Sequence, residues 1–430
     1  MNQRIFHATL CRISLLICIL ISPALAAASA VDTATGVFSP AIASLQLRVD
    51  GSPFAVPVAT LDNQQGISLH FDLLNPDGER LRYHLVPCSA EWIPEGLVDS
   101  EWTDSFNDAP VPDPVWSETP ALPYSHFSFD PLEAIPVNIS GNYLVRVTPD
   151  SAPDSILLQA RIMVADGSAK IDGSVSSRTD IDFNRARQQL TLSVDPAGLD
   201  RRVNPMDLIT IVSQNERPDL ARRLPSPTRI EGRSLIYDHL PQLVFMSGNE
   251  YRRFDAVNLT TPGLHVESLG YEYPFHVFNL AVDQPREDTM YVYDLTRRGR
   301  FIVRDDSSAD SDVEAEYVLV RFTLEMPRLY GARVYVEGDF TSRRFSPACE
   351  MTYNPDSRAY ELTMMLKQGA YDYQYLAVED GASQGITRLI EGDYYNTSNA
   401  YDVAVYYRIP SERHDRLAAF SLIFSNGQQQ

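Results

Sequence analysis

Short segments in which apolar and polar residues alternate recur along almost the whole chain, and turn residues separate them. Residues 81–86, Leu-Arg-Tyr-His-Leu-Val, show this period of two clearly, which is typical of a half-buried strand in an antiparallel sheet. Helical patterns are rare, and the best internal one, residues 214–223, is limited to a turn or two by Pro218. The pattern predicts an all-β protein with little helix.

Turn signals at this spacing are typical of β-sandwiches of immunoglobulin or early-set type, and we expect three such domains in series. Breaks at residues 166–168 (Asp-Gly-Ser) and 297–299 (Arg-Arg-Gly) mark the boundaries. The expected units are a signal peptide at 1–30, β domains at 31–166, 167–297 and 298–412, and a short helix or frayed tail at 413–430. The expected strands are residues 45–49, 66–73, 81–87, 125–130, 141–148, 156–164, 171–175, 189–194, 208–213, 235–237, 263–269, 277–282, 316–325, 333–337, 360–366, 371–378 and 401–408.

Residues 1–30 have the features of an export signal. Arg4 and Arg12 supply positive charge, residues 13–21 form a short apolar run, and Ala-Ser-Ala at 28–30 fits a cleavage site. No later segment is apolar over the length that a membrane-spanning helix needs. We therefore expect an exported, soluble mature chain with no direct membrane insertion.

Cys88 and Cys349 are the cysteines that remain once the signal is removed. Two cysteines exclude a disulfide framework and a four-ligand zinc cluster. An oxidising compartment permits a bridge between them, but two buried free thiols is the interpretation that we favour.

The chain is strongly acidic, with a formal net charge of −21, and residues 31–166 alone hold 19 acidic and 5 basic groups. We expect no nucleic-acid partner, because phosphate contacts need a basic face. Strong acidity mainly favours solubility. We interpret the charge of the first domain as a solvated face, and a charge-complementary partner is the alternative.

The common catalytic signatures are missing. The chain has no G-x-S-x-G elbow, no G-x-x-x-x-G-K loop and no H-E-x-x-H pair. His84 and His126 stand on strands that flank one long loop and could meet in space, but we interpret them as histidines satisfied within their sheets. Residues 305–316 are rich in carboxylates but lack the glycine and glutamate of an EF-hand loop. We expect no enzyme activity, no catalytic residue, no metal, no cofactor and no small-molecule ligand.

All three tryptophans, Trp92, Trp102 and Trp116, fall in one connection, residues 88–123, which has neither strand nor helix periodicity. A connection this long inside a compact domain is usually functional or disordered. Three indoles argue against disorder, because each carries a large apolar area that must be covered. We expect an ordered loop and hypothesise that Trp92, Trp102 or Trp116 binds a partner. The alternative is that these indoles cap the first domain's own core.

Several strings in a fixed order resemble one family. They are residues 83–92 (YHLVPCSAEW), 101–106 (EWTDSF), 117–120 (SETP), 124–127 (YSHF), 140–144 (SGNYL), 214–215 (QN), 248–255 (GNEYRRFD) and 316–318 (EYV). The set resembles the plug protein family of the bacterial type IX secretion system over nearly the whole mature chain. Glu91 replaces the usual aspartate and Trp102 stands where tyrosine is commoner, and both changes keep the chemistry.

This resemblance implies a periplasmic, all-β protein of several domains. It implies that the protein binds the very large outer-membrane translocon β-barrel on its periplasmic side and seals the pore when no cargo occupies it. The family brings no motif for a catalytic residue, so the resemblance also implies a non-enzymatic role.

The third segment also resembles the glycogen-binding, early-set sandwich of amylolytic enzymes, through residues 334–340 (VYVEGDF) and 369–375 (GAYDYQY). That module stacks sugars on a tryptophan shortly after the Gly-Asp-Phe turn, and residues 341–344 here contain none. A fold can be shared without its site. The alternative function that this resemblance implies is a periplasmic or surface carbohydrate-binding accessory protein.

Overall fold

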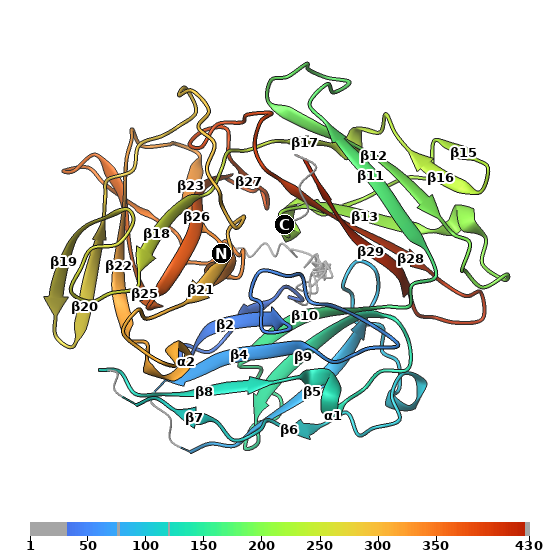
Figure 1. The fold of residues 1–430 in the computed structure, drawn as a ribbon, viewed down its shortest axis with the longest axis horizontal. Helices are drawn as coiled ribbons and strands as arrows, with labels where there is room; N and C mark the ends of the chain where they lie inside the picture. The colour runs from blue at the N-terminus through green and yellow to red at the C-terminus, as the bar shows by residue number, and fades with distance from the viewer. Residues whose placement is uncertain (1–31, 75–77, 119–120, 426–430) are drawn as a thin grey trace, which may run out of the picture. The chain divides into compact units, whose positions relative to one another are not determined.

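The computed structural model describes residues 32–74, 78–118 and 121–425, and strands dominate it (Figure 1). Within these residues the strands form six sheets, and three large hydrophobic cores lie among them. Each core takes side chains from two sheets, as in a β-sandwich. The predicted all-β class is confirmed. The predicted signal peptide lies outside the described residues, and no helix within them is long and apolar enough to cross a membrane.

The N-terminal sandwich encloses the first core. Its first sheet has the order β1 (Gly36–Val37), β10 (Leu158–Ala165), β9 (Gly141–Pro149), β5 (Leu81–Cys88), β6 (Ala109–Pro110), with β3 (Val58–Thr60) paired to β10. Its second sheet has the order β2 (Ile42–Val49), β4 (Ile67–Leu74), β8 (Tyr124–Phe129), β7 (Val115–Trp116). Two short helices belong to this part of the chain, η1 (Asp99–Glu101) and α1 (Pro131–Ala134).

The middle sandwich encloses the second core. One sheet has the order β11 (Lys170–Ser176), β12 (Arg187–Asp195), β16 (Ser234–Tyr237), β15 (Arg229–Glu231), with β17 (Val244–Met246) paired to β12. The other has the order β14 (Arg222–Arg223), β13 (Ile209–Gln214), β28 (Ala400–Tyr407), β29 (Arg416–Phe424). Three single turns of 3₁₀ helix connect the strands: η2 (Pro205–Asp207), η3 (Pro218–Leu220) and η4 (Pro241–Leu243).

The third sandwich encloses the third core. One sheet has the order β18 (Arg252–Ala256), β26 (Gly369–Glu379), β21 (Phe301–Val303), with β23 (Ala332–Glu337) and β27 (Gly385–Ile386) also paired to β26. The other has the order β19 (Val266–Glu272), β20 (Phe275–Leu280), β22 (Tyr317–Glu325), β25 (Ala359–Lys367), β24 (Thr352–Asn354). Its short helices are α2 (Ser311–Glu314) and η5 (Asp339–Thr341).

The arrangement of the sandwiches along the chain differs from the predicted series. Strand β28 pairs with β13 of the middle sandwich and β29 pairs with β28, and Figure 1 shows these dark red strands beside green ones. The third sandwich is therefore inserted into the middle one. The boundaries predicted at residues 297 and 412 do not separate them, because the periodicity of a strand identifies the strand and not its distant partner.

Residues 416–424 form strand β29, where the sequence predicts a short helix or a frayed tail. Strand β28 is buried along its whole length, so its backbone groups need hydrogen-bonded neighbours on both sides. Strand β13 supplies one side and β29 the other. Tertiary pairing thus overrides the amphipathic helical pattern of this segment.

The second sheet of the N-terminal sandwich packs its outer face against the third sandwich. Leu69 of β4 points into the first core, and Asp72 lies on the opposite face, as alternation requires. Asp72 is nevertheless fully buried, and it accepts hydrogen bonds from Lys367 Nζ at 2.6 Å and Tyr317 Oη at 2.7 Å. A buried carboxylate that is paired in this way joins the two sandwiches.

Cys88 and Cys349 are both buried free thiols, as the favoured interpretation holds. Burial raises the pKa of Cys88 to about 12. Because the thiolate is the reactive form, the Cys88 side chain is inert at neutral pH.

Candidate functional site

Trp102 belongs to the core of the N-terminal sandwich. It follows η1, is fully buried, and has its ring centroid 5.7 Å from that of Tyr143. Its indole Nε1 has no hydrogen-bond partner among the described residues, so apolar packing holds it in place. A side chain with no exposed surface does not meet a partner, so Trp102 leaves the set of candidate contact residues. Trp102 therefore fits the alternative interpretation, in which the indole belongs to the first domain's own core.

Trp92 lies in a tight turn and is partly buried. Its φ is 64°, in the left-handed region, and its amide donates to the carbonyl of Ser89 at 2.9 Å. The guanidinium of Arg161 lies 4.4 Å from the centroid of the indole, which is a cation–π distance. One face of Trp92 is therefore already covered from within the protein.

Trp116 is the most open of the three tryptophans. It lies on β7, the edge strand of its sheet, and is 57% exposed. Phe106 of the same loop is 94% exposed. Because each exposed aromatic ring offers a large apolar contact area at low conformational cost, such side chains are suited to partner contacts.

The loop that carries these side chains is anchored to the rest of the protein. Asn107 accepts a hydrogen bond from the amide of Leu85 at 2.8 Å and donates one to its carbonyl at 2.9 Å. Arg413, between β28 and β29, forms an ion pair with Glu101 at 2.7 Å. The described part of the loop is therefore held in place at Asn107 and Glu101, and a backbone that is already held needs little ordering on binding.

A second exposed apolar segment, residues 290–295, lies between β20 and β21, and no sequence pattern pointed to it. Met290 and Val292 are 88% and 74% exposed, and Tyr293 and Leu295 are also exposed. Tyr291 fixes the segment, because its hydroxyl donates to Glu250 Oε1 at 2.6 Å. Apolar residues are common on protein surfaces as well as in cores. Hydrophobicity alone therefore did not distinguish this exposed segment from a buried strand.

A cavity of about 200 Å³ lies where the three sandwiches meet. Its apolar wall includes Trp92, Met163, Ile211, Tyr406 and Phe420, and its polar floor includes Glu216, Arg300, Asp339, Arg343 and Asp402. The residues of this floor are largely paired with one another. These pairs connect the sandwiches, and we call the group the junction.

Arg300 of the third sandwich is the centre of that junction. It donates to Glu216 of the middle sandwich at 2.6 Å and to the carbonyl of Pro53 in the N-terminal sandwich at 3.1 Å. Asp402 lies on the same floor, and burial together with the charge of Glu216 raises the pKa of Asp402 to about 7. The junction thus holds a carboxyl group that titrates near neutral pH.

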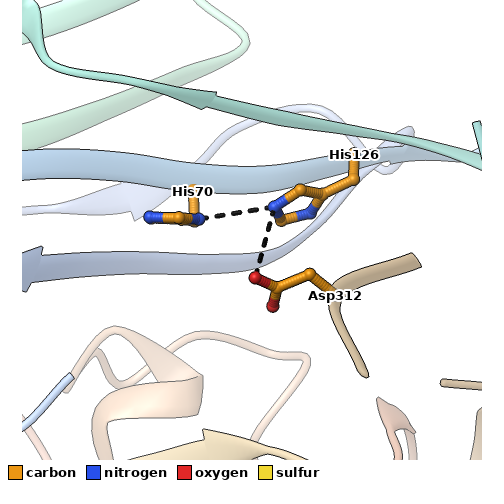
Figure 2. A group of neighbouring side chains, drawn as sticks. All are labelled: His70, His126 and Asp312. Carbon is orange, nitrogen blue, oxygen red and sulfur yellow. Dashed lines mark hydrogen bonds and ion pairs between the residues drawn. The ribbon is translucent and has the colours of Figure 1, made fainter. Parts of the chain in front are cut away.

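Two histidines and a carboxylate form a cluster on the outer face of β4 and β8 (Figure 2). They are His70 of β4, His126 of β8 and Asp312 of α2. His70 Nδ1 lies 3.3 Å from His126 Nε2, and Asp312 Oδ2 lies 3.9 Å from the same Nε2. His126 Nδ1 lies 2.7 Å from Asp72 Oδ1. In the register of β4 and β8, Asp72 is opposite His126 and His70 is opposite Ser128, so the two histidines are diagonal neighbours on one face.

The sequence pattern suggested His84, not His70, as the neighbour of His126. His84 lies on β5, in the first sheet of the sandwich, whereas β8 belongs to the second. The missing information was the pairing of β4 with β8. Burial and the charge of Arg48 lower the pKa of His70 to about 3, so its imidazole is neutral at physiological pH.

The turn that corresponds to the sugar site of early-set modules is closed here. Phe340 packs edge-to-face on Phe301 and Tyr371. Arg343, in the run where the module carries tryptophan, is buried and pairs with Glu337 at 3.1 Å. The turn therefore lacks the exposed aromatic platform on which that module stacks sugars.

The fold defines the class of the molecule: an all-β protein of three packed sandwiches, one inserted into another. A model of the first domain of type 9 secretion system plug proteins matches residues 42–166. A solved structure, described as a hypothetical protein from Parabacteroides merdae ATCC 43184, is 33% identical with a TM-score of 0.88, and the match covers 92% of this chain and 100% of that one. The chain belongs to the type 9 secretion system plug protein family.

Dimeric latent PorU from Porphyromonas gingivalis aligns with 11% identity and a TM-score of 0.15, over 90% of this chain and 34% of that one. This similarity is too low to support any inference. No curated protein matches the chain.

Proposed function

We propose that the protein is a non-enzymatic component of the type 9 secretion system that binds the outer-membrane translocon barrel and seals its periplasmic opening. Membership of the plug family supports this function. The family also supports a periplasmic location, in which the protein is held at the outer membrane through its partner. The structural observation that carries the proposal is the anchored loop with its exposed Trp116 and Phe106.

The architecture suits this role for a physical reason. A protein that closes a pore needs a surface that is already rigid, because side chains and loops that become ordered on binding reduce the affinity. Polar contacts join the three sandwiches to one another, through the buried pair Asp72 with Lys367 and the partly buried pair Arg300 with Glu216. The loop then meets its partner from a scaffold that does not rearrange.

Co-purification tests the proposal. The tagged chain would be purified gently from the outer membranes of its own host, and the proteins that accompany it would be identified. We expect a single barrel protein far larger than the bait. Recovery of the bait alone, or with sugar-processing proteins only, would overturn the proposal.

Residues 290–295 are a second candidate for the surface that contacts the barrel. If the paired change Met290→Ser and Val292→Ser abolishes capture of the barrel while Trp116→Ala leaves it intact, the contact lies on residues 290–295 and not on the tryptophan loop. The opposite result assigns the contact to the loop. Both variants change exposed side chains, so neither should alter folding.

A further inference from the structure

We propose that His70, His126 and Asp312 form a binding site for a divalent transition-metal ion, with Zn²⁺ as the ion that the donor set fits. The three ligand atoms lie within 4.8 Å of one another, and Figure 2 shows His70 and Asp312 approaching the same nitrogen of His126. Two imidazole nitrogens and one carboxylate oxygen are zinc ligands. Mg²⁺ and Ca²⁺ prefer oxygen donors, so they fit this set poorly.

The spacing of the histidines agrees with tetrahedral coordination. Two nitrogens that each lie about 2.0–2.1 Å from a tetrahedral Zn²⁺ are about 3.3–3.4 Å apart. The observed separation of His70 Nδ1 and His126 Nε2 is 3.3 Å. Asp312 Oδ2 lies 3.9 Å from His126 Nε2, and all three ligand atoms lie within 4.8 Å of one another. Asp312 therefore has to move toward both histidines to complete three protein ligands, which leaves the fourth position for water.

The surrounding hydrogen bonds hold both rings in the required orientation. Asp72 accepts from His126 Nδ1, which leaves the lone pair of Nε2 for the ion and forms the carboxylate–histidine–metal arrangement common in zinc sites. His70 Nε2 lies 2.9 Å from Ser68 Oγ. When that nitrogen carries the proton and donates to the serine, His70 Nδ1 offers its lone pair. Metal binding then requires the His70 proton to stand on Nε2 and not on Nδ1. The imidazole stays neutral, so no proton has to be released.

Arg48 limits the affinity of the site. Its guanidinium donates to both oxygens of Asp312, each at 2.7 Å, and its positive charge opposes that of an incoming cation. A carboxylate has about four lone-pair positions, so Asp312 can accept from Arg48 and bind an ion together. We therefore infer an exchangeable site and not a permanently occupied one.

The site spans two sandwiches, because His70 and His126 belong to the N-terminal one and Asp312 to the third. A bound ion would thus strengthen the interface that Asp72 and Lys367 also hold. An ion that binds only the folded state raises the free energy of unfolding as its concentration increases.

Titration of Zn²⁺ into the full chain, purified with a tag that contains no histidine, tests the site. A chromophoric chelator reports the competition for the ion. We expect one equivalent to bind, and His70→Gln or His126→Gln to weaken its binding by about tenfold or more. His84→Gln is the matched control, because this histidine lies in the same sandwich on the other sheet. Full affinity in both cluster variants would overturn the proposal.

Two further measurements do not depend on how well the histidine variants fold. X-ray absorption at the zinc edge of the wild-type complex should show two imidazole nitrogens around the ion, and a shell without imidazole contradicts the assignment. Arg48→Gln should tighten Zn²⁺ binding, because it removes the positive charge that is paired with the Asp312 carboxylate. Unchanged or weaker binding in that variant argues against Asp312 as the third ligand.

Discussion

The three tryptophans of one loop occupy three different environments. Trp102 is buried in the core, Trp92 packs under Arg161, and Trp116 is exposed on an edge strand. The sequence predicts that the loop is ordered, since indoles need cover, but it assigns all three the same candidate role. Which indole faces inward depends on the packing of β9 and η1, which composition does not show.

Trp102→Ala should destabilise the N-terminal sandwich strongly. The change removes a fully buried indole that packs against Tyr143, and the loss of a large core aromatic costs about 3–5 kcal/mol. Denaturant unfolding followed by tyrosine and tryptophan fluorescence measures the effect. A loss below about 1 kcal/mol would show that the ring is not part of the core.

Trp116→Ala should have the opposite profile. Its exposed ring contributes little to folding, so the melting temperature should stay unchanged, while capture of the translocon barrel should weaken about tenfold or more if the ring is a contact hot spot. Phe183→Ala is the control, because Phe183 is 61% exposed on the middle sandwich, outside the loop. Equal losses of capture in both variants would contradict a specific role for Trp116.

At the scale of the element, the alternating pattern predicts strands well and their pairing poorly. Residues 81–87 and 316–325 are predicted strands and coincide closely with β5 and β22. The segment 416–424 was expected as a helix or tail and is a strand, because β28 requires a neighbour. The same limit applies to the His70–His126 cluster, which exists only through the register of β4 with β8.

Deletion of residues 413–430 tests the role of β29. Strand β28 would then lose its second neighbour, and Ala418 and Ile423 would no longer contribute to the second core. We expect the shortened chain to unfold at a lower temperature in calorimetry, because its second core is incomplete. Deletion of residues 426–430 alone, which leaves β29 intact, is the control. A shortened chain that unfolds like the full one would show that the segment is dispensable.

At the scale of the whole molecule, polar junctions connect three hydrophobic cores. Arg300 contacts Glu216 and Pro53 in the other two sandwiches. Arg300→Met should cost about 1–3 kcal/mol, because it removes the ion-pair partner of the partly buried Glu216 carboxylate. The double variant with Glu216→Gln should recover much of this loss. Equal stability of the single and double variants in urea unfolding would argue against coupling of these two side chains.

Asp402 makes stability depend on pH. Its pKa is raised to about 7 by burial and by the charge of Glu216, above the value of about 3.9 in an unfolded chain. The folded state therefore binds the proton more tightly, and this stabilisation is complete below about pH 4 and is lost as the pH rises through 7.

The variant Asp402→Asn should remove this dependence, since asparagine keeps the shape and does not titrate. Between pH 5 and pH 8, the free energy of unfolding of the wild type should fall by about 2–3 kcal/mol more than that of the variant. Urea unfolding at the two pH values measures the difference. Parallel pH profiles for the two proteins would contradict a raised pKa.

The junction at Arg300 also affects how a force on one sandwich is transmitted to the others. A pull applied to any one sandwich reaches the other two through short polar links rather than through flexible linkers. We therefore expect the three sandwiches to separate together and not one at a time. Under the proposed function, the three sandwiches would therefore bind and dissociate together.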